Sequence, residues 1–221
     1  MYYILSYHGD TSNNLLMEKL FELRNEVFIE ELSWSNMKGT DNQERDQFDD
    51  SHTTYYAITD REKNVIGCTR VRPTIIKHMN NTIFQELCSY DGPPISPTIV
   101  EASRICISKG HRITRRSAPF FLLNQMMMEH LFSLGYTEIT FSAHLDRIPF
   151  LNKFGYELRI LGPTKRFEGR LCVAVISQIN ERVLTNMARF TRVKSVLEKI
   201  KNKIQGQVNY GSQTKRFTRN R

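Results

Sequence analysis

Cysteine is scarce in this chain of 221 residues. Its four cysteines, Cys68, Cys88, Cys106 and Cys172, form no CxxC pair and no metal-ligand spacing, so we expect reduced, mostly buried thiols and no metal site. No run approaches the roughly 18 apolar residues of a membrane span. The opening MYYILSYHGD has no basic leader and meets Asp10 too early for a signal peptide. These absences predict a cytoplasmic protein without a membrane span.

The main part of the chain also lacks an excess of positive charge. The net charge is +8, yet the segment from Arg189 to Arg221 holds ten Lys and Arg against one acid, Glu198. The basic character therefore belongs to the C-terminal tail. A nucleic-acid-binding regulator would rest on this tail alone, and no RNP, zinc or clear helix-turn-helix signal supports it. We expect no nucleic-acid partner.

Apolar periodicity predicts one α/β domain over residues 1–180. Helices are expected over 12–31, 118–134 and 148–154. Strands are expected over 53–59, 65–71, 99–107, 137–143, 157–161 and 171–177. Strands that begin as a meander and then alternate with helices indicate a mixed sheet with flanking helices.

The C-terminal region predicts a separate element. A basic amphipathic helix is expected over 181–204, followed by a basic, flexible tail over 205–221. The apolar face of this helix suits packing on the sheet or on a partner subunit. A membrane-surface or nucleic-acid contact is the alternative.

An acidic segment interrupts the regular pattern. Ten residues from Asp41 hold five acids within a long non-periodic loop, 33–52. The segment lacks the DxDxDG calcium pattern, so a solvated acidic loop is the simplest interpretation. Arginines and aromatics nevertheless flank it: Arg24, Phe28 and Trp34 before, Arg70 and Arg104 after, with a further acid at Glu101. Together these groups suit a ligand bearing a carboxylate, a cation and an aromatic base.

The ordered motifs resemble one known family. They are R-x3-F (Arg24, Phe28), L-x-W (Leu32, Trp34), E-x-D-x-x-D (Glu44, Asp46, Asp49), G-x-x-R-x-x-P-T (Gly67, Arg70, Pro73, Thr74), Phe84 and E-x-S-R (Glu101, Ser103, Arg104). This series is similar to that of the LuxI-type acyl-homoserine-lactone synthases over about residues 1–110. Val100 and Ile105 depart from the family, which has aromatic residues there.

The resemblance implies a reaction and its substrates. Family members join the amino group of S-adenosylmethionine, a substrate rather than a cofactor, to an acyl chain carried by acyl carrier protein or by coenzyme A. Lactone closure then expels methylthioadenosine and leaves an N-acyl-L-homoserine lactone, a quorum-sensing signal. No other cofactor is implied.

The resemblance also assigns residues to the reaction. Contacts to S-adenosylmethionine are expected from Arg24, Phe28, Trp34, Asp46, Asp49, Ser103 and Arg104. Glu101 is the candidate base, Glu44 the alternative, and Arg70 and Arg104 complete the catalytic set. Backbone amides near Glu101 would bind the developing oxyanion. The alternative is that the arginines and acids form an ion-pair network that braces the loop, and both interpretations can hold.

The second half resembles the GNAT acyltransferases, whose splayed strands form a V-shaped cleft for a pantetheine arm. The turn HRITRRSA lacks the glycines typical of acetyl-CoA users, so side chains would replace backbone amides as phosphate donors. Contacts to the carrier phosphate or the carrier protein are expected from Arg112, Arg115, Arg116 and Lys153. Coenzyme A is not excluded, and a solvated basic turn is the alternative.

The acyl pocket is the least specified part. Candidate residues are Phe84, Ser103, Leu122, Met126 and Thr140. In the family a threonine on the 137–143 strand is associated with 3-oxoacyl substrates, and a one-residue slip would turn Thr140 to the other face. Met126 to Met128 at helical spacing are more often core residues. A GNAT-type N-acyltransferase that acts on another amine is the alternative function.

Overall fold

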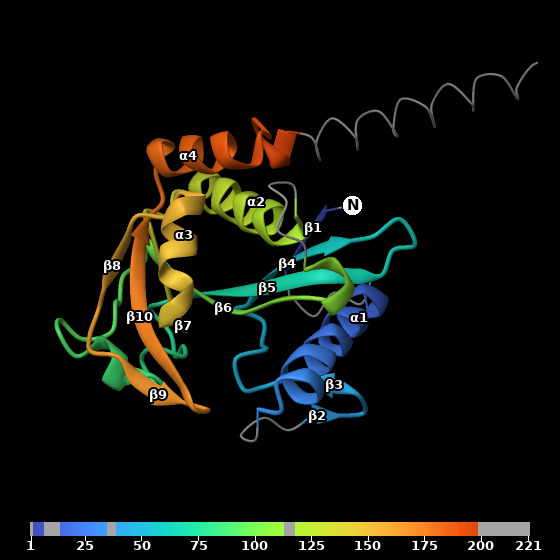
Figure 1. Cartoon of the computed structure of the whole chain (residues 1–221), viewed down its shortest axis with the longest axis horizontal. Coiled ribbons are helices and arrows are strands. Elements are labelled where there is room, and N and C mark those ends of the chain that lie inside the picture. Colours follow the sequence, from blue (N-terminus) through green and yellow to red (C-terminus); the bar gives the residue numbers. More distant parts are fainter. Residues whose placement is uncertain (1, 7–13, 35–38, 113–117, 199–221) are drawn as a thin grey trace, which may run out of the picture.

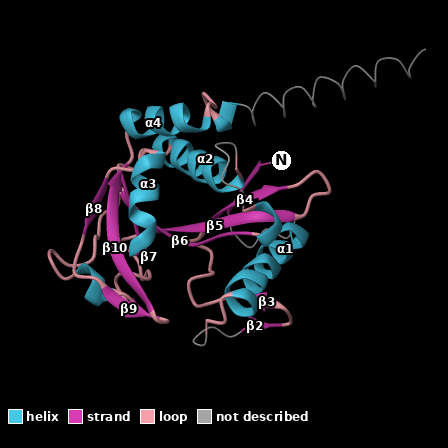
Figure 2. Ribbon diagram, viewed as in Figure 1, coloured by secondary structure: helices cyan, strands magenta, loops and turns pink. Residues whose placement is uncertain are grey.

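The computed structural model describes residues 2–6, 14–34, 39–112 and 118–198, which form a sheet covered by helices (Figures 1 and 2). The strands are β1 (Tyr2–Ser6), β2 (Gly39–Thr40), β3 (Gln43–Glu44), β4 (Thr54–Thr59), β5 (Val65–Pro73), β6 (Ile99–Ile107), β7 (Glu138–His144), β8 (Leu158–Ile160), β9 (Lys165–Phe167) and β10 (Arg170–Gln178). The longer helices are α1 (Asn14–Arg24), a π-helix (Asn25–Glu31), α2 (Pro119–Ser133), α3 (Ile148–Phe154) and α4 (Glu181–Thr191). The predicted mixed α/β fold is confirmed.

The main sheet has one parallel junction. Its strand order is β1-β4-β5-β6-β7-β10-β8, with β9 beside β10. Only β6 and β7 run parallel among these pairs, since α2 carries the chain back between them. They pair at just three positions, the last being Glu101 opposite Thr140. Beyond that point the described residues of β6 and β7 no longer pair, and the strands diverge as the predicted cleft requires (Figure 1).

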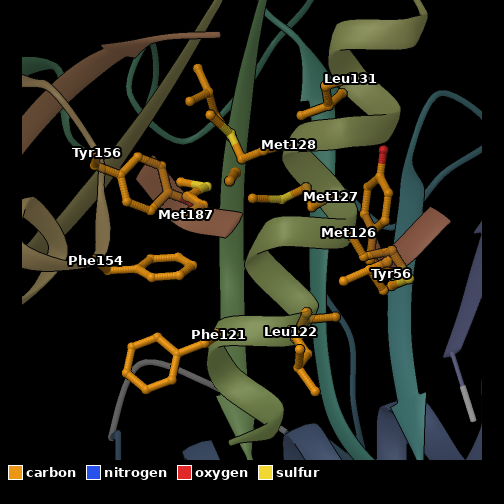
Figure 3. Packing of buried hydrophobic residues seen from close by; sticks show 14 of the residues in the cluster. Tyr56, Phe121, Leu122, Met126, Met127, Met128, Leu131, Phe154, Tyr156 and Met187 are labelled. Carbon is orange, nitrogen blue, oxygen red and sulfur yellow. The ribbon is translucent and has the colours of Figure 1, made fainter. Parts of the chain in front are cut away.

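The two faces of the sheet bury different helices. Tyr56 and Ile58 of β4 face the cluster under α2, whereas Tyr55 and Ala57 face the cluster under α1. This split follows from the alternation of side chains along a strand. Figure 3 shows Met126, Met127 and Met128 packed among apolar side chains of the α2 cluster. Met126 and Leu122 are thus core residues of this structure.

The first helix changes form before it ends. The 12–31 pattern predicts one regular helix, but the chain widens into a π-helix from Asn25 to Glu31. A backbone bond from Leu32 N to Val27 O, five residues back, continues this wider spacing. Such segments occur often at functional sites, and this one carries Phe28.

The C-terminal helix is shorter than predicted. A continuous helix over 181–204 is wrong, because α4 ends at Thr191 and Arg192 adopts a left-handed conformation with φ 60°. Thr191 Oγ1 donates to Gln125 Oε1 of α2 at 2.6 Å, and Gln125 Nε2 donates to Val193 O at 2.8 Å. These contacts hold the turn against α2. The remaining tail, 199–221, lies outside the described residues.

A second helical segment starts just after this turn. Glu129 of α2 accepts the backbone N–H groups of Val196 and Leu197 and the hydroxyl of Ser195. Its carboxylate therefore acts as a cap supplied from another helix. Packing on the domain is thus the interpretation that the structure supports for this part of the amphipathic region.

Replacing Arg192 by glycine should stabilise the protein by about 0.5–1 kcal/mol. A left-handed residue with a Cβ costs roughly 1–2 kcal/mol, and the larger entropy of unfolded glycine offsets about half of that. Urea unfolding measures the change. The matched control, Arg189→Gly inside the exposed face of α4, should destabilise by about 1 kcal/mol. Equal losses in both variants would contradict the assigned turn.

Candidate functional site

The acidic segment folds onto the sheet rather than extending into solvent. Phe48 is buried and anchors it, and Arg72 of β5 donates to Phe48 O and to both carboxylate oxygens of Asp50. Asp46 Oδ1 accepts from Phe48 N at 2.9 Å, and Asp46 N donates to Asp49 Oδ2 at 2.8 Å. The solvated loop is therefore wrong: the loop is internally bonded and covers one face of the sheet.

Arg24 connects the end of α1 to this loop. It is 1% exposed, and its Nε donates to Glu44 Oε2 at 2.6 Å. Its two terminal nitrogens donate to the two oxygens of Asp49 at 2.7 and 2.9 Å. A buried, bidentate guanidinium of this kind fixes both partners in orientation.

Arg70 of β5 holds the other side of the loop. It is fully buried and binds both oxygens of Asp46, at 2.5 and 2.7 Å. It also donates to Asp49 Oδ1 at 2.9 Å and, through Nε, to Ser103 Oγ at 2.9 Å. Arg70 thus joins the loop to β6.

Arg104 reaches the same carboxylates through a distortion of β6. Alternation would turn it away from Ser103, but its φ is 55° and the pairing of β5 with β6 shifts register beside it. The bulge lets Arg104 donate to Asp46 Oδ2 at 2.7 Å and to Glu44 at 3.3 Å. A regular strand would place Arg104 on the face opposite Ser103, so the bulge is what brings Arg104 to Asp46 while Ser103 bonds to Arg70.

The six groups form a charge-balanced unit, which we call the network: Arg24, Arg70 and Arg104 with Glu44, Asp46 and Asp49. Burial alone would raise the pKa of Asp49, but the hydrogen bond and charge of Arg24, with Arg70, hold it well below its usual range. Arg70 and Arg104 likewise outweigh burial and lower the pKa of Asp46. Of the three acids, Asp46 is the most accessible, with 14% of its side chain exposed. The network braces the loop, and Asp46 is its most accessible carboxylate even though both of its oxygens accept from guanidiniums.

An aromatic pair stands beside the network. The Phe28 and Trp34 rings stack with centroids 4.9 Å apart, and the Arg104 guanidinium lies 5.7 Å from the Phe28 centroid. The backbone N–H of Trp34 also donates to Phe28 O at 3.1 Å, which fixes the chain just after the end of the π-helix. A planar ligand ring and an anionic group could therefore bind near one another here.

Glu101 lies apart from the network. Its Oε1 accepts His78 Nδ1 at 3.0 Å and Asn80 N at 2.6 Å, and its Oε2 accepts Met79 N at 2.7 Å. The sequence prediction missed His78 and Asn80, because an irregular loop gives no periodicity and a single histidine carries little signal. Glu101 is 2% exposed and organises this turn.

The predicted acyl-binding residues do not gather in one place. Thr140 is fully buried, donates to Val175 O at 2.9 Å and accepts Asn80 Nδ2 at 3.1 Å. Phe84 packs edge-on against Phe167 in a third cluster. Leu122 and Met126 belong to the core under α2. Of the five candidates, Ser103 and Thr140 lie near Glu101. Ser103 is two residues further along β6, and Thr140 of β7 is paired with Glu101.

The predicted phosphate contacts are likewise dispersed. Arg112 follows β6, donates to Ile107 O at 2.7 Å and pairs with Glu31 at 2.7 Å. Lys153 of α3 lines a surface depression of about 360 Å³ together with Arg189 and Phe190 of α4. Arg115 and Arg116 lie outside the described residues.

The described part of the chain holds neither a membrane-spanning helix nor a cluster of metal-ligating side chains. No helix there is long and apolar enough to cross a membrane. Nor does any group of three His, Cys, Asp or Glu side chains in those ranges suit a metal ion. The four cysteines are buried and unbridged, as the sequence predicts.

The network should make stability depend on acid. The pKa values of Asp46 and Asp49 are lower in the folded protein than their unfolded value of about 3.9. Their contribution is therefore complete above that unfolded value and is lost as the pH falls through the folded values. We expect the melting temperature to be flat from pH 7 to about 5 and to fall steeply below about 4. Asp49→Asn should flatten the acid limb, and an unchanged limb would contradict this assignment.

Comparison with known proteins places the chain in a family. The model of the family described as autoinducer synthase matches residues 8–186. An acyl-homoserine-lactone synthase from Aliivibrio fischeri is 32% identical over 156 residues, which is 66% of this chain and 80% of that protein.

Solved structures share the fold. The coenzyme-A-dependent acyl-homoserine lactone synthase BjaI, solved with S-adenosylmethionine and isopentyl-CoA, matches with a TM-score of 0.82 at 23% identity, over 89% of this chain and 91% of that one. A putative N-acetyltransferase from Lactobacillus plantarum matches with a TM-score of 0.55 at 17% identity, over 81% and 99%, so the fold is GNAT-like. By the extent of the family match and the identity to a curated member, the chain belongs to the autoinducer synthases, a family of acyltransferases that make acyl-homoserine lactones.

Proposed function

We propose that this protein makes a quorum-sensing signal by transferring an acyl group to the amine of S-adenosylmethionine. Lactone closure then releases N-acyl-L-homoserine lactone and methylthioadenosine. The observation that carries the proposal is the network, which gathers three guanidiniums and three carboxylates beside an aromatic pair and next to diverging strands.

The charges of S-adenosylmethionine match this arrangement. The substrate carries an α-ammonium, a sulfonium and a carboxylate around an adenine ring. We assign the cationic part to Asp46, the most accessible of the three acids, whose backbone N–H is bonded to Asp49. Arg104 is the guanidinium that lies over the aromatic pair, 5.7 Å from the Phe28 centroid. Phe28 and Trp34 supply the surface for adenine. Arg24 and Arg70 are buried, so they do not contact the substrate in this proposal. They act by holding Asp46 and Asp49 in orientation.

Acyl transfer requires a neutral amine, so the α-ammonium must lose a proton first. We assign this step to Glu101 and its surroundings rather than to Glu44. Both oxygens of Glu44 already accept from guanidiniums of Arg24 and Arg104. Glu101 Oε2 accepts a single bond, so Glu101 retains capacity for a proton-transfer role.

The thioester would enter where β6 and β7 separate. Past Glu101 the backbone of β6 has no β7 partner among the described residues, which leaves peptide groups free to meet the thioester oxygen. Ser103 lies on this stretch, fixed by Arg70. We therefore propose that the thioester binds between the network and the core under α2.

The acyl donor is an acyl carrier protein or coenzyme A. Arg112, partly exposed at the end of β6, suits a phosphate from either source. No metal or additional cofactor takes part in the proposed reaction, and we expect no nucleic-acid partner.

A donor panel tests the proposal. The purified protein is incubated with S-adenosylmethionine and with acyl-carrier-protein or acyl-CoA thioesters of several chain lengths, and products are read by mass spectrometry. An acyl-homoserine lactone with methylthioadenosine is the expected result, and the productive thioester names the donor. Free thiol without methylthioadenosine would indicate a simple acyltransferase or thioesterase instead.

A further inference from the structure

A buried histidine stands behind Glu101 with one nitrogen unused. His78 is fully buried, and its Nδ1 lies 3.0 Å from Glu101 Oε1. Its Nε2 has no hydrogen-bond partner among the residues that the structure describes. Leaving a buried polar atom unpaired costs about 1–3 kcal/mol, so such an atom in a native protein calls for a ligand, a water or a chemical role.

The imidazole is held rigidly. His78 N donates to Asn81 Oδ1 at 2.7 Å, and the next two backbone N–H groups, of Met79 and Asn80, both donate to Glu101. A carboxylate bonded to Nδ1 fixes the tautomer with the proton on that nitrogen and leaves Nε2 as an acceptor. The arrangement is that of a carboxylate-oriented base.

The turn also sits at the point where the strands part. Glu101 is the last residue of β6 that pairs with β7, and its partner is Thr140. Asn80 spans this position, since its backbone bonds Glu101 and its side chain bonds Thr140 and Ser142. Through its bond to Glu101, the imidazole is therefore fixed next to the last paired position of β6 and β7, which is the closed end of the proposed thioester site.

The same turn touches the network. Met79 Sδ lies 3.6 Å from an Arg70 nitrogen and 4.0 Å from an Arg104 nitrogen. The charged groups facing the turn are Glu101 from β6, Arg72 from β5, whose Nε donates to Lys77 O at 3.3 Å, and, across the Met79 sulfur, the guanidiniums of Arg70 and Arg104. The β7 side chains bonded to the turn among the described residues are the neutral Thr140 and Ser142. The turn lies between the groups assigned to S-adenosylmethionine and the strand edge assigned to the thioester.

We propose, on the basis of the function proposed above, that His78 accepts the ammonium proton, directly or through one water, and that Glu101 positions it. The N–H bond of the ammonium breaks and a bond to His78 Nε2 forms, and Glu101 stabilises the imidazolium. The neutral amine then attacks the thioester: the C–N bond forms, the C–S bond breaks, and the second amine proton goes to the leaving thiolate. His78 finally returns its proton to solvent.

The test uses His78→Asn in the full chain. The asparagine amide can still donate toward Glu101 in place of Nδ1, but it has no basic nitrogen. General-base catalysis contributes typically 10²–10⁴-fold, so we expect kcat to fall by about that factor near neutral pH. The KM for S-adenosylmethionine and the melting temperature should stay close to wild type. The loss should shrink as the pH rises, because a growing fraction of the amine is then already neutral.

The possible results separate the role of His78 from the proposed function. A kcat of His78→Asn within about threefold of wild type would overturn the role of His78. A fall in kcat that does not depend on pH would overturn it as well, and so would a defect that appears mainly in KM. If His78→Asn does not fold, His78→Gln is subjected to the same measurements and criteria. A wild-type protein that forms no lactone with any donor would instead overturn the proposed function itself, and this inference with it.

Discussion

Replacing Arg70 by methionine is expected to destabilise the protein by about 3–5 kcal/mol and to abolish lactone synthesis. Arg70 is fully buried and binds both Asp46 and Asp49. Its removal would leave the three carboxylates of the network against two guanidiniums, Arg24 and Arg104, and an uncompensated buried charge is strongly destabilising in this range. The loop would then no longer present Asp46 in a fixed position. Urea unfolding and the lactone assay measure the two effects.

A matched substitution separates burial from charge. Arg112 also pairs with one acid, Glu31, but its side chain is 40% exposed. Arg112→Met should therefore change the free energy of unfolding by less than about 1 kcal/mol. If Arg70→Met proved as mild as Arg112→Met, the network would not be the brace described above. Arg70→Lys should recover only part of the loss, since lysine cannot reproduce the bidentate bonds.

Replacing Asp46 by asparagine is expected to stop turnover while the protein stays folded. The carboxamide keeps the shape of the side chain and one acceptor oxygen, and Arg70 keeps its bonds to Asp49 and Ser103. The negative charge proposed to attract the α-ammonium and sulfonium is lost. We expect the rate to fall at least about 100-fold, equivalent to about 2.7 kcal/mol of transition-state binding.

The control for this variant comes from the same loop. Asp50 is also paired with an arginine, Arg72, but it is 41% exposed and lies outside the network. Asp50→Asn should retain near-normal activity. Near-normal activity of Asp46→Asn would contradict the assignment of Asp46 to the substrate, whatever the stability of either variant.

Much of the fold follows from local pattern. The strand predicted over 99–107 and the helix predicted over 148–154 match β6 and α3 to the residue, because each is a short apolar run with a clear boundary signal such as Gly155. The network residues were identified through the ordered motifs. Their spacing alone does not show that Arg24 and Arg70, which are 46 positions apart in the chain, share one carboxylate.

Other features depend on contacts that no local pattern reveals. The end of α4 at Thr191 is fixed by Gln125 and Glu129 of α2, whereas the apolar repeat alone continues through Ile204. The strand β1 was not predicted, since Tyr2–Ser6 gains its structure by pairing with β4. The short β9 likewise forms by pairing with β10.

The acyl-binding prediction was the weakest for a related reason. It drew residues from four segments whose faces are set only by tertiary packing. The register of β7 puts Thr140 beside Glu101, while Ile139 enters the core. The turn at His78 follows Pro73 and Thr74 without any periodicity. A site built on such a turn becomes visible only once its hydrogen bonds are known.

The central claim is that one site both acylates S-adenosylmethionine and closes the lactone. The most direct measurement uses S-adenosylmethionine labelled with ¹⁸O at both carboxylate oxygens, with the lactone and methylthioadenosine quantified by mass spectrometry. Attack of the carboxylate on its own γ-carbon predicts equimolar products and a lactone that keeps both labels. A lactone that has lost one label, or that forms without methylthioadenosine, would contradict the account.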